Sequence, residues 1–349
     1  ETTSTGITVT GAVNGIPFYS GGTGSIYTHN VSGTDDSANY NTAYGLTALD
    51  AIQTGDRNTA IGFSAAGALT TGVENVIIGT DAGAALTSGS YNVAVGKGAL
   101  SSEDAHGKNV AIGYAALQVQ DAGQDAYNVA IGFEAGHDLI QGKKNTLVGG
   151  FAGSKITSAI YNTALGYQSL AANLIGDNNT ALGYLALQDF VADTDSHGNN
   201  TAVGSSSMSN ATTGTENTAI GALAIGTGVT TGNDNVAVGY AAGYNLTSGN
   251  SNVFVGRSSG VSVLTGVQNV ALGYNSMGTA NGSESKNVAI GFNALALMDS
   301  DGDNFNTAVG YEAGLAVTTG TRNTLVGGRA GDALTTGVRN VAIGYSALS

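Results

Sequence analysis

The sequence contains no cysteine, no tryptophan and a single proline, Pro17, among its 349 residues. Without cysteine no disulfide can contribute to stability, which on its own does not reveal the compartment. Proline is too rare for a collagen or a proline-rich linker, whereas the 55 glycines supply many turn formers. These absences favour a rod stabilised by backbone pairing.

Basic residues are scarce as well. Eleven Lys and Arg residues stand against 25 Asp and Glu residues, which gives a net charge of −14. Because a protein needs clustered positive charge to grip a phosphate backbone, we expect no nucleic-acid partner. The sequence also lacks an apolar run of about 18 residues and a basic-then-apolar leader. We therefore expect no membrane insertion.

The sequence is rich in one phrase, Asn-(Thr/Val)-Ala-(Ile/Val/Leu)-Gly, which has eighteen copies, five of which vary at the third or fourth residue. Consecutive copies most often lie seventeen positions apart, and the remaining steps are slightly longer. The copies begin at positions 41, 58, 75, 92, 109, 128, 145, 162, 179, 200, 217, 235, 252, 269, 287, 306, 323 and 340. A fixed period of this kind indicates one elongated repeat array.

The phrase has the alternation of a β-strand. With each asparagine counted as position 0, position +1 is always Thr or Val, and position +3 is Ile, Val or Leu except at Tyr44. These two positions share one face of a strand. Position +2 is Ala in fourteen copies, position +4 is always Gly and position +7 is always Ala or Ser. The other face is therefore nearly flat.

Seventeen residues cannot hold a helix hairpin with its loops, but they can hold two short strands and two glycine turns. We predict an all-β fold, a parallel β-solenoid of about 18 coils with 17-residue repeats. Stacking at about 4.8 Å per coil would give a length on the order of 85 Å. Residues 41–349 would form the solenoid, and residues 1–40 a β-rich lead-in or adaptor, or else a disordered linker.

The invariant positions are expected to be structural. Stacked asparagine amides can hydrogen-bond along the axis, and small residues in register let neighbouring backbones approach closely. The flat face would also suit packing against a second copy of the chain. The residues assigned to this structural ladder include Asn58, Asn75, Asn92, Asn109, Gly62, Gly79, Gly96 and Gly113.

The copies differ from one another in two correlated ways. A residue larger than Ala at +2 never occurs with an aromatic residue at +5, which suggests that both compete for one volume. Coils with Gly or Ala at +8 always have Leu, Ile or Val at +11, and every longer spacing follows a coil with a large residue at +8. We infer that an anchor at +11 pins the second strand, whereas an anchor at +8 frees the following loop.

Two stretches carry a family resemblance: NTAIGFSAAGALTTGVENVIIG at 58–79 and NTAVGYEAGLAVTTGTRNTLVG at 306–327. They resemble the head repeats of YadA-like trimeric autotransporter adhesins, and still more the longer repeats of bacteriophage tail fibres. The resemblance covers 41–349. It implies a left-handed parallel β-roll that assembles as a homotrimer, projects from a virion or cell, and mediates attachment to a host or surface.

The implied partners are copies of the same chain, a host cell-surface receptor or glycan, and other fibre or virion proteins. The period is longer than in the adhesin heads, and no coiled-coil stalk or membrane anchor is recognisable in the sequence. We therefore expect a virion tail fibre, or an extracellular fibre, more than a protein anchored in a cell envelope.

No catalytic spacing is visible. The four histidines, His29, His106, His137 and His197, fall at unrelated repeat positions, and no nucleophile elbow occurs. We expect no enzyme activity and no cofactor. One possible exception is a calcium site formed by the alternating carboxylates of Asp299, Asp301 and Asp303. An EF-hand would require a glutamate where Gly310 stands, and a solvated acidic loop is the alternative.

Recognition is expected in the longer loops near 101–108, 118–127, 188–199, 278–286 and 296–305, although no single receptor-binding residue can be assigned and the loops could simply drift. An ice- or mineral-binding solenoid is one alternative function, because Thr occupies +1 in five successive coils (Thr146, Thr163, Thr180, Thr201 and Thr218). Blocks of Val and one unusually long step between coils interrupt that column. Another alternative is the non-catalytic shaft of a polysaccharide depolymerase, whose active enzyme would need a carboxylate pair between protomers.

Overall fold

The computed structural model describes residues 12–13, 16–17, 19–20, 23–29, 37–192, 198–280 and 282–349. These residues form strands, turns and bends. None of them belongs to a helix that could cross a bilayer. The chain divides into two compact units, Glu1–Ile160 and Tyr161–Ser349.

The strands are short and evenly spaced along the chain. The first unit contains β1 (Ala12–Val13), β2 (Ile16–Pro17), β3 (Tyr19–Ser20), β4 (Ile26–Tyr27), β5 (Thr42–Tyr44), β6 (Thr59–Ile61), β7 (Val76–Ile78), β8 (Val93–Val95), β9 (Val110–Ile112), β10 (Val129–Ile131) and β11 (Thr146–Val148). The second unit contains β12 (Thr163–Leu165), β13 (Thr180–Leu182), β14 (Thr201–Val203), β15 (Thr218–Ile220), β16 (Val236–Val238), β17 (Val253–Val255), β18 (Val270–Leu272), β19 (Val288–Ile290), β20 (Thr307–Val309), β21 (Thr324–Val326) and β22 (Val341–Ile343).

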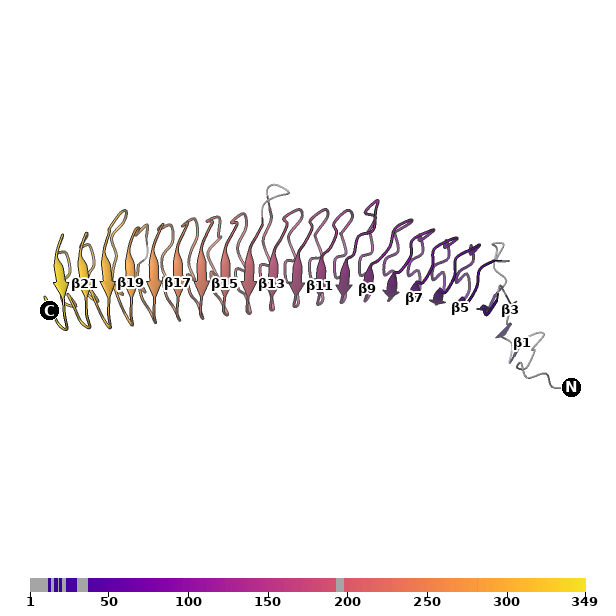
Figure 1. Ribbon diagram of the computed structural model, residues 1–349, viewed down its shortest axis with the longest axis horizontal. Coiled ribbons are helices and arrows are strands. Elements are labelled where there is room, and N and C mark those ends of the chain that lie inside the picture. The colour runs from indigo at the N-terminus through magenta and orange to yellow at the C-terminus, as the bar shows by residue number, and fades with distance from the viewer. Residues whose placement is uncertain are drawn as a thin grey trace. The chain divides into compact units, whose positions relative to one another are not determined.

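Within each unit, the strands of successive coils pair in parallel with equivalent positions opposite one another (Figure 1). Ala60 of β6 lies opposite Ile77 of β7. The longer spacings do not shift this register, since Ala181 of β13 lies opposite Ala202 of β14 across the longest step. Strands β5–β11 and β12–β22 thus give seven and eleven coils, one for each copy of the phrase. The prediction of a parallel β-solenoid built on the period of the phrase is confirmed.

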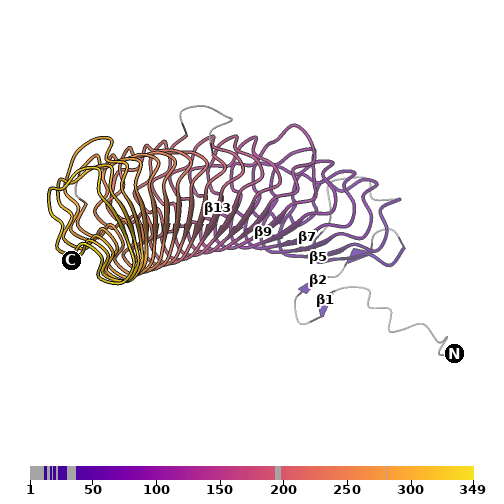
Figure 2. The same cartoon turned by 60° about the vertical axis from the view of Figure 1, so that its left-hand side comes forward.

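Each coil contains one three-residue strand, so the prediction of a second strand is wrong. The return half is a series of turns in which positions +6 and +8 have left-handed backbone, as at Ser64 (φ 58°) and Ala66 (φ 50°). An extended strand cannot contain such residues. The return half still bonds to the next coil, because the Thr70 N–H donates to the Thr87 carbonyl at 2.8 Å. Figure 2 shows the strands gathered along one side of the coils.

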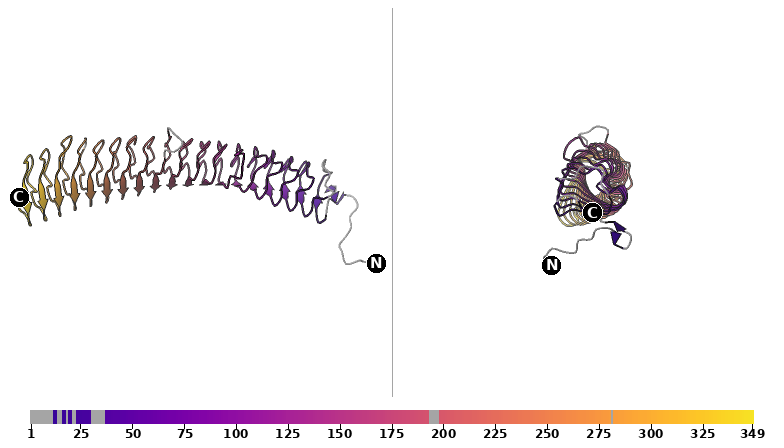
Figure 3. Two further views of the ribbon diagram at one scale, coloured as in Figure 1. Left: turned by 45° about the horizontal axis from the view of Figure 1, so that its top comes forward. Right: turned by 90° about the vertical axis from the view of Figure 1, so that its right-hand side faces the viewer.

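The interior of each coil is lined by the small residues of the strand. Ala60 at +2 and Ala65 at +7 are completely buried, and their equivalents in the other described coils short of the last are buried as well. The flat face is therefore the inner wall, and its interpretation as a surface for a partner copy is wrong. A coil of so few residues is narrow, so small strand residues leave room for the larger side chains at +8 and +11. The right-hand view of Figure 3 shows the backbone of the coils encircling this interior.

The explanation of the +2 and +5 correlation is also wrong, because these positions face opposite sides of the coil. Phe254 at +2 is fully buried, whereas the +5 aromatics are exposed. A Cβ atom at Gly260 would lie 2.5 Å from the Phe254 ring, and one at Gly243 would lie 3.0 Å from it. A bulky +2 side chain therefore fills the space left by glycine at +8. In ten of the fourteen coils with Ala at +2, a large residue such as the buried Leu100 or Leu117 occupies +8 instead.

Glycine at +4 is required by both its backbone conformation and its neighbours. Gly62 has φ +132°, which L-residues rarely adopt. A Cβ atom there would lie 2.7 Å from the carbonyl carbon and oxygen of Gly79 in the next coil. The strand can turn into the return half only because this contact contains no side chain.

The described part of residues 1–40 is paired as well. β1 and β2 form an antiparallel pair, and β3 pairs antiparallel with β4. β4 then pairs in parallel with β5, which places the buried Tyr27 opposite Ala43. Residues 26–27 thus extend the hydrogen-bonding pattern of the first coil.

Candidate functional site

The invariant asparagines form a buried column of hydrogen bonds within each unit. The Oδ1 atom of Asn58 accepts from the backbone N–H and from Nδ2 of Asn75, both at 3.0 Å. Asn75 Nδ2 also donates to the Gly89 carbonyl at 2.9 Å. The same backbone-to-side-chain bond links Asn92 to Asn75 and Asn109 to Asn92. Since these side chains are buried, the column serves the fold and is not a ligand surface.

The three carboxylates considered as calcium ligands are held by separate contacts. Asp303 Oδ2 lies 2.6 Å from Lys286 Nζ, and Asp301 Oδ1 accepts from the N–H and the hydroxyl of Ser283 at 3.1 and 3.2 Å. Asp299, Asp301 and Asp303 do not belong to the side-chain group that comes together at metal-ligand spacing among the described residues. Residues of the preceding coil therefore already bind two of these carboxylates, and the three carboxylates do not converge on one point.

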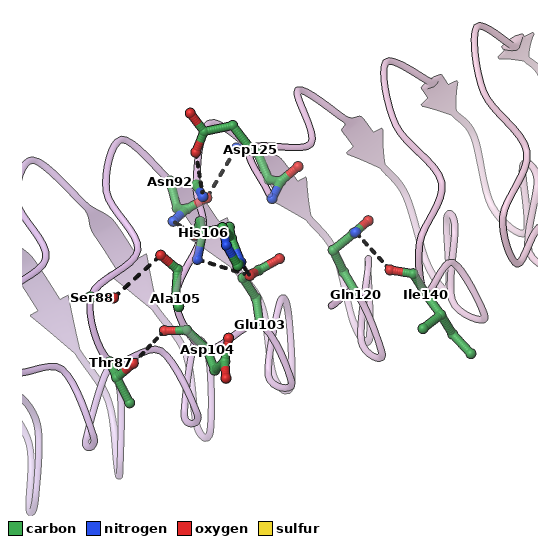
Figure 4. Close-up of polar contacts among 12 residues, drawn as sticks. Thr87, Ser88, Asn92, Glu103, Asp104, Ala105, His106, Gln120, Asp125 and Ile140 are labelled. Atoms are coloured by element: carbon green, nitrogen blue, oxygen red, sulfur yellow. Dashed lines mark hydrogen bonds and ion pairs between the residues drawn. The ribbon is translucent and has the colours of Figure 1, made fainter. Parts of the chain in front are cut away.

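The group that does come together consists of Glu103, Asp104, His106 and Asp121, whose ligand atoms all lie within 4.8 Å of one another. Figure 4 shows the Glu103 and His106 side chains pointing toward each other. Burial raises the pKa of the Glu103 carboxyl, although the N–H of His106 opposes the rise. Histidine positions considered alone gave no hint of this group. The available signal was the pairing of Glu at +11 with His at +14, where other coils have Leu and Gly.

The remaining histidines do not form such groups. His137 Nδ1 lies 2.5 Å from Asp138 Oδ1, and His29 Nε2 lies 3.5 Å from Asp50 Oδ1. His197 falls outside the described residues. Neither of the two described pairs suggests a general base with a nucleophile beside it.

The longer loops are anchored from within. Glu103, Gln120, Phe190 and Met298 occupy position +11 and are fully buried, although their coils carry large residues at +8. Position +11 thus points inward in both kinds of coil. The idea that an anchor at +8 alone leaves the next segment free is therefore wrong for the described parts of these loops.

Exposed apolar side chains recur along the outer strand face, which we define as the side chains at positions −1, +1, +3 and +5. The aromatic residues at +5 are between 41% exposed (Phe292) and 78% exposed (Tyr345). Aliphatic residues at +3 lie beside them, among them Ile61, Leu182 and Ile220. The exposed aromatics of this face include Tyr40, Tyr44, Phe63, Tyr91, Tyr114, Tyr127, Phe133, Tyr161, Tyr167, Tyr184, Tyr240, Tyr274, Phe292, Phe305, Tyr311 and Tyr345.

These aromatic rings stack from coil to coil. In the second unit the rings of Tyr274 and Phe292 stack at 5.2 Å, and those of Phe292 and Tyr311 at 5.3 Å. The Arg257 guanidinium continues this column, 5.5 Å from the Tyr240 ring and 6.0 Å from the Tyr274 ring. Five successive coils thus present one continuous ring-and-guanidinium column.

A face of this kind offers contact area and ring surfaces, and it contains no catalytic arrangement of acids, bases or nucleophiles among its described residues. Exposed apolar patches that extend over many residues commonly mark interaction surfaces. Aromatic residues are also enriched at the centres of protein interfaces. Comparisons with models of protein families and with curated proteins found no match to this chain.

Proposed function

We propose that this chain is a non-catalytic structural and adhesive fibre segment that assembles as a homotrimer. It projects from a virion or a cell and mediates attachment to a host or other surface. The observation that supports this proposal best is the outer strand face, which exposes aromatic and aliphatic side chains coil after coil.

A copy of the same chain is a suitable partner for that face. Successive coils repeat their contacts at about 4.8 Å, and a second copy in parallel register has the same spacing. The +1 and +3 columns of the face contain no charged residue, so two copies could meet along these columns with little repulsion. Closed rotational symmetry would end the association at a fixed number of copies. The number three follows from the resemblance of the repeats to trimeric fibres.

Attachment would use the surface that assembly leaves open. Receptor proteins or glycans of a host are the expected partners, because stacked tyrosine and phenylalanine rings provide flat apolar surfaces with polar edges. Other fibre or virion proteins would join this segment to its particle. The protein would accordingly act outside the cell or on a virion.

The alternative of an ice- or mineral-binding solenoid has less support. Thr180, Thr201 and Thr218 do lie on the outer strand face at +1. However, the protruding rings at +5, such as Tyr184, lie on the same face and break its flatness. A depolymerase shaft would share the proposed architecture and differ only in having an enzyme attached.

The first test is the assembly state and shape of the purified chain. Sedimentation equilibrium should give three times the chain mass, and negative-stain electron microscopy should show thin fibres with three-fold averages. A monomer at micromolar concentration would contradict the proposed assembly. Binding to host-cell glycans and surface proteins, measured on arrays, would then test attachment separately.

A further inference from the structure

One coil in the first unit departs from the repeat in its interior. At position +11, where Leu69, Leu86 and Leu139 pack in other coils, the coil that begins at Asn92 has Glu103. At position +14, where several coils have glycine, it has His106. A carboxylate and an imidazole thus replace a core side chain and a turn residue in one coil. The length of the coil does not require either replacement, because this coil has the common period.

The Glu103 side chain is completely buried, yet only one of its two carboxylate oxygens accepts a hydrogen bond among the described residues. Oε1 accepts from the backbone N–H of His106 at 3.1 Å, and His106 Nδ1 lies 3.6 Å from the same oxygen. Oε2 of Glu103 and Nδ1 of His106 are buried and have no hydrogen-bond partner among the described residues. A buried carboxylate with an open oxygen is costly unless another charge or donor meets it.

A second buried glutamate shows what a self-sufficient arrangement looks like in this fold. Glu284 is also completely buried. Its Oε2 accepts from the Gly282 N–H at 3.1 Å, and its Oε1 accepts from the Ser300 N–H at 3.3 Å. Both oxygens are therefore engaged by the protein itself. At Glu103, by contrast, Oε1 has a backbone donor and Oε2 has none.

Two further carboxylates complete the surroundings of Glu103. Asp104 and Asp121 are exposed, and their ligand atoms lie within 4.8 Å of those of Glu103 and His106. The nearest basic residue along this stretch, Lys108, pairs with Asp125. Among the described residues, no Lys or Arg forms an ion pair with Glu103, Asp104 or Asp121. Three carboxylates therefore converge on one imidazole without a protein cation between them.

We propose that Glu103, Asp104, His106 and Asp121 bind one divalent transition-metal ion, with zinc or manganese as the best fit. One oxygen of Glu103, one ring nitrogen of His106 and one oxygen of each of the two exposed carboxylates lie within 4.8 Å of one another. Imidazole and carboxylate ligands suit Zn²⁺ and Mn²⁺, whereas Ca²⁺ and Mg²⁺ prefer sites built from oxygen alone. The inference does not depend on the proposed fibre function.

The ion would join two neighbouring coils. Glu103, Asp104 and His106 belong to the return half of the coil that begins at Asn92, and Asp121 belongs to the next coil, which is one of the longer ones. The ladder is weak there, since Asn92 Nδ2 reaches the His106 carbonyl only at 3.4 Å (Figure 4). Asn109 Nδ2 has no hydrogen-bond partner among the described residues. A metal ion at this point would restore a link between the coils.

The test is metal titration of the tag-free full chain after treatment with EDTA. Isothermal titration calorimetry with ZnCl₂ and with MnCl₂ should give one site per chain for at least one of the two ions. Asp121→Asn and His106→Ala should weaken that binding at least about 10-fold. Asp121 is exposed, so its substitution leaves the interior intact, and far-ultraviolet circular dichroism would verify the fold.

Matched controls come from the same chain. His137→Ala removes a histidine that also neighbours an aspartate, and Glu284→Gln alters the other completely buried glutamate. Both variants should bind the ion as the wild type does. The proposal would be overturned if neither Zn²⁺ nor Mn²⁺ bound at a stoichiometric site. Equal binding by the Asp121→Asn, His106→Ala and wild-type chains would also overturn it. Tighter binding of Ca²⁺ than of both Zn²⁺ and Mn²⁺ would overturn the assignment of the ion class.

Discussion

At the scale of single residues, the asparagine column shows why one side chain is invariant through eighteen copies. The Asn252 side chain donates from Nδ2 to Asn235 Oδ1 and to the Gly266 carbonyl, and its Oδ1 accepts from N and Nδ2 of Asn269. An asparagine supplies both donor and acceptor in this geometry, whereas aspartate or leucine would lack one or both.

Asn252→Ala should therefore destabilise the second unit by about 3 kcal/mol, because the buried Asn269 N–H and Gly266 carbonyl each lose a partner. The measurement is thermal and urea unfolding followed by circular dichroism, with hydrogen exchange to locate the change. Asn250→Ala, at an exposed position of the preceding turn, is the matched control and should cost less than about 1 kcal/mol. Equal effects of the two substitutions would contradict the role of the column.

The burial of Glu284 makes the stability of the fold depend on pH. It raises the pKa of the Glu284 carboxyl above its usual value of 4.5, the charge of Asp301 adds to the rise, and hydrogen bonds from backbone N–H groups oppose it. The folded state thus holds the proton more tightly than the unfolded state. The resulting stability is complete below the unfolded pKa of about 4.3 and is lost as the pH rises through the higher folded value.

The stability of the wild type relative to Glu284→Gln should consequently fall between about pH 4 and the folded pKa of this carboxyl, and then level off. Urea unfolding of both proteins at closely spaced pH values measures this difference, and the subtraction removes the contribution of the other acids. A relative stability that increases with pH would show that the hydrogen bonds to Glu284 outweigh its burial.

At the scale of the element, a coil keeps its interior filled by exchanging volume between +2 and +8. Phe254→Ala should cost about 3–5 kcal/mol, because Gly243 and Gly260 leave nothing else to fill the cavity. Gly260→Leu alone should also destabilise, since its Cβ would lie 2.5 Å from the Phe254 ring. The double variant reproduces the Ala and Leu combination of the coil that begins at Asn92, and should recover at least about 2 kcal/mol.

Unfolding of the two single variants and the double variant would complete a double-mutant cycle. The backbone at Gly260 has φ +58°, close to the φ of 53° at Leu100, so leucine at +8 finds a conformation already used elsewhere in the chain. Additive effects of the two substitutions would show that these positions do not share a volume.

The period, the strand and the parallel stacking could all be predicted from the sequence, because eighteen copies share Asn at position 0 and Gly at +4, and fourteen of them have Ala at +2. Alternation also placed +1 and +3 on one face, but it could not tell which face points inward. The inner face became clear only from the structure, in which Ala60 at +2 is buried and Ile61 at +3 is 38% exposed. The second strand was predicted because residues such as Ser64 and Ala66 give no sign of a left-handed backbone in their side chains.

The candidate sites were harder to predict for a related reason. Asp299, Asp301 and Asp303 alternate in sequence, but spacing along one loop does not reveal that Lys286 and Ser283 of the preceding coil engage two of them. Glu103 and Asp121 come together only because successive coils stack in register. Contacts between coils therefore have to be read down the columns of the repeat.

At the scale of the whole molecule, we expect the outer strand face to determine whether the chain is a monomer or assembles with further copies. Phe292 and Tyr311 stack on adjacent coils and are 41% and 50% exposed. Replacement of both with lysine should weaken self-association at least about 100-fold, because burying two unpaired charges costs several kcal/mol. The fold should persist, since neither ring contributes to the interior of the coil.

Sedimentation velocity over a range of concentrations measures this change, with circular dichroism as the check on folding. Val229→Lys is the matched control, because Val229 is 60% exposed at position +12, away from the outer strand face. That variant should sediment as the wild type does. If the control dissociates and the Phe292→Lys/Tyr311→Lys variant does not, the copies meet through the turns, and the aromatic column is then free along its length to contact a receptor or glycan.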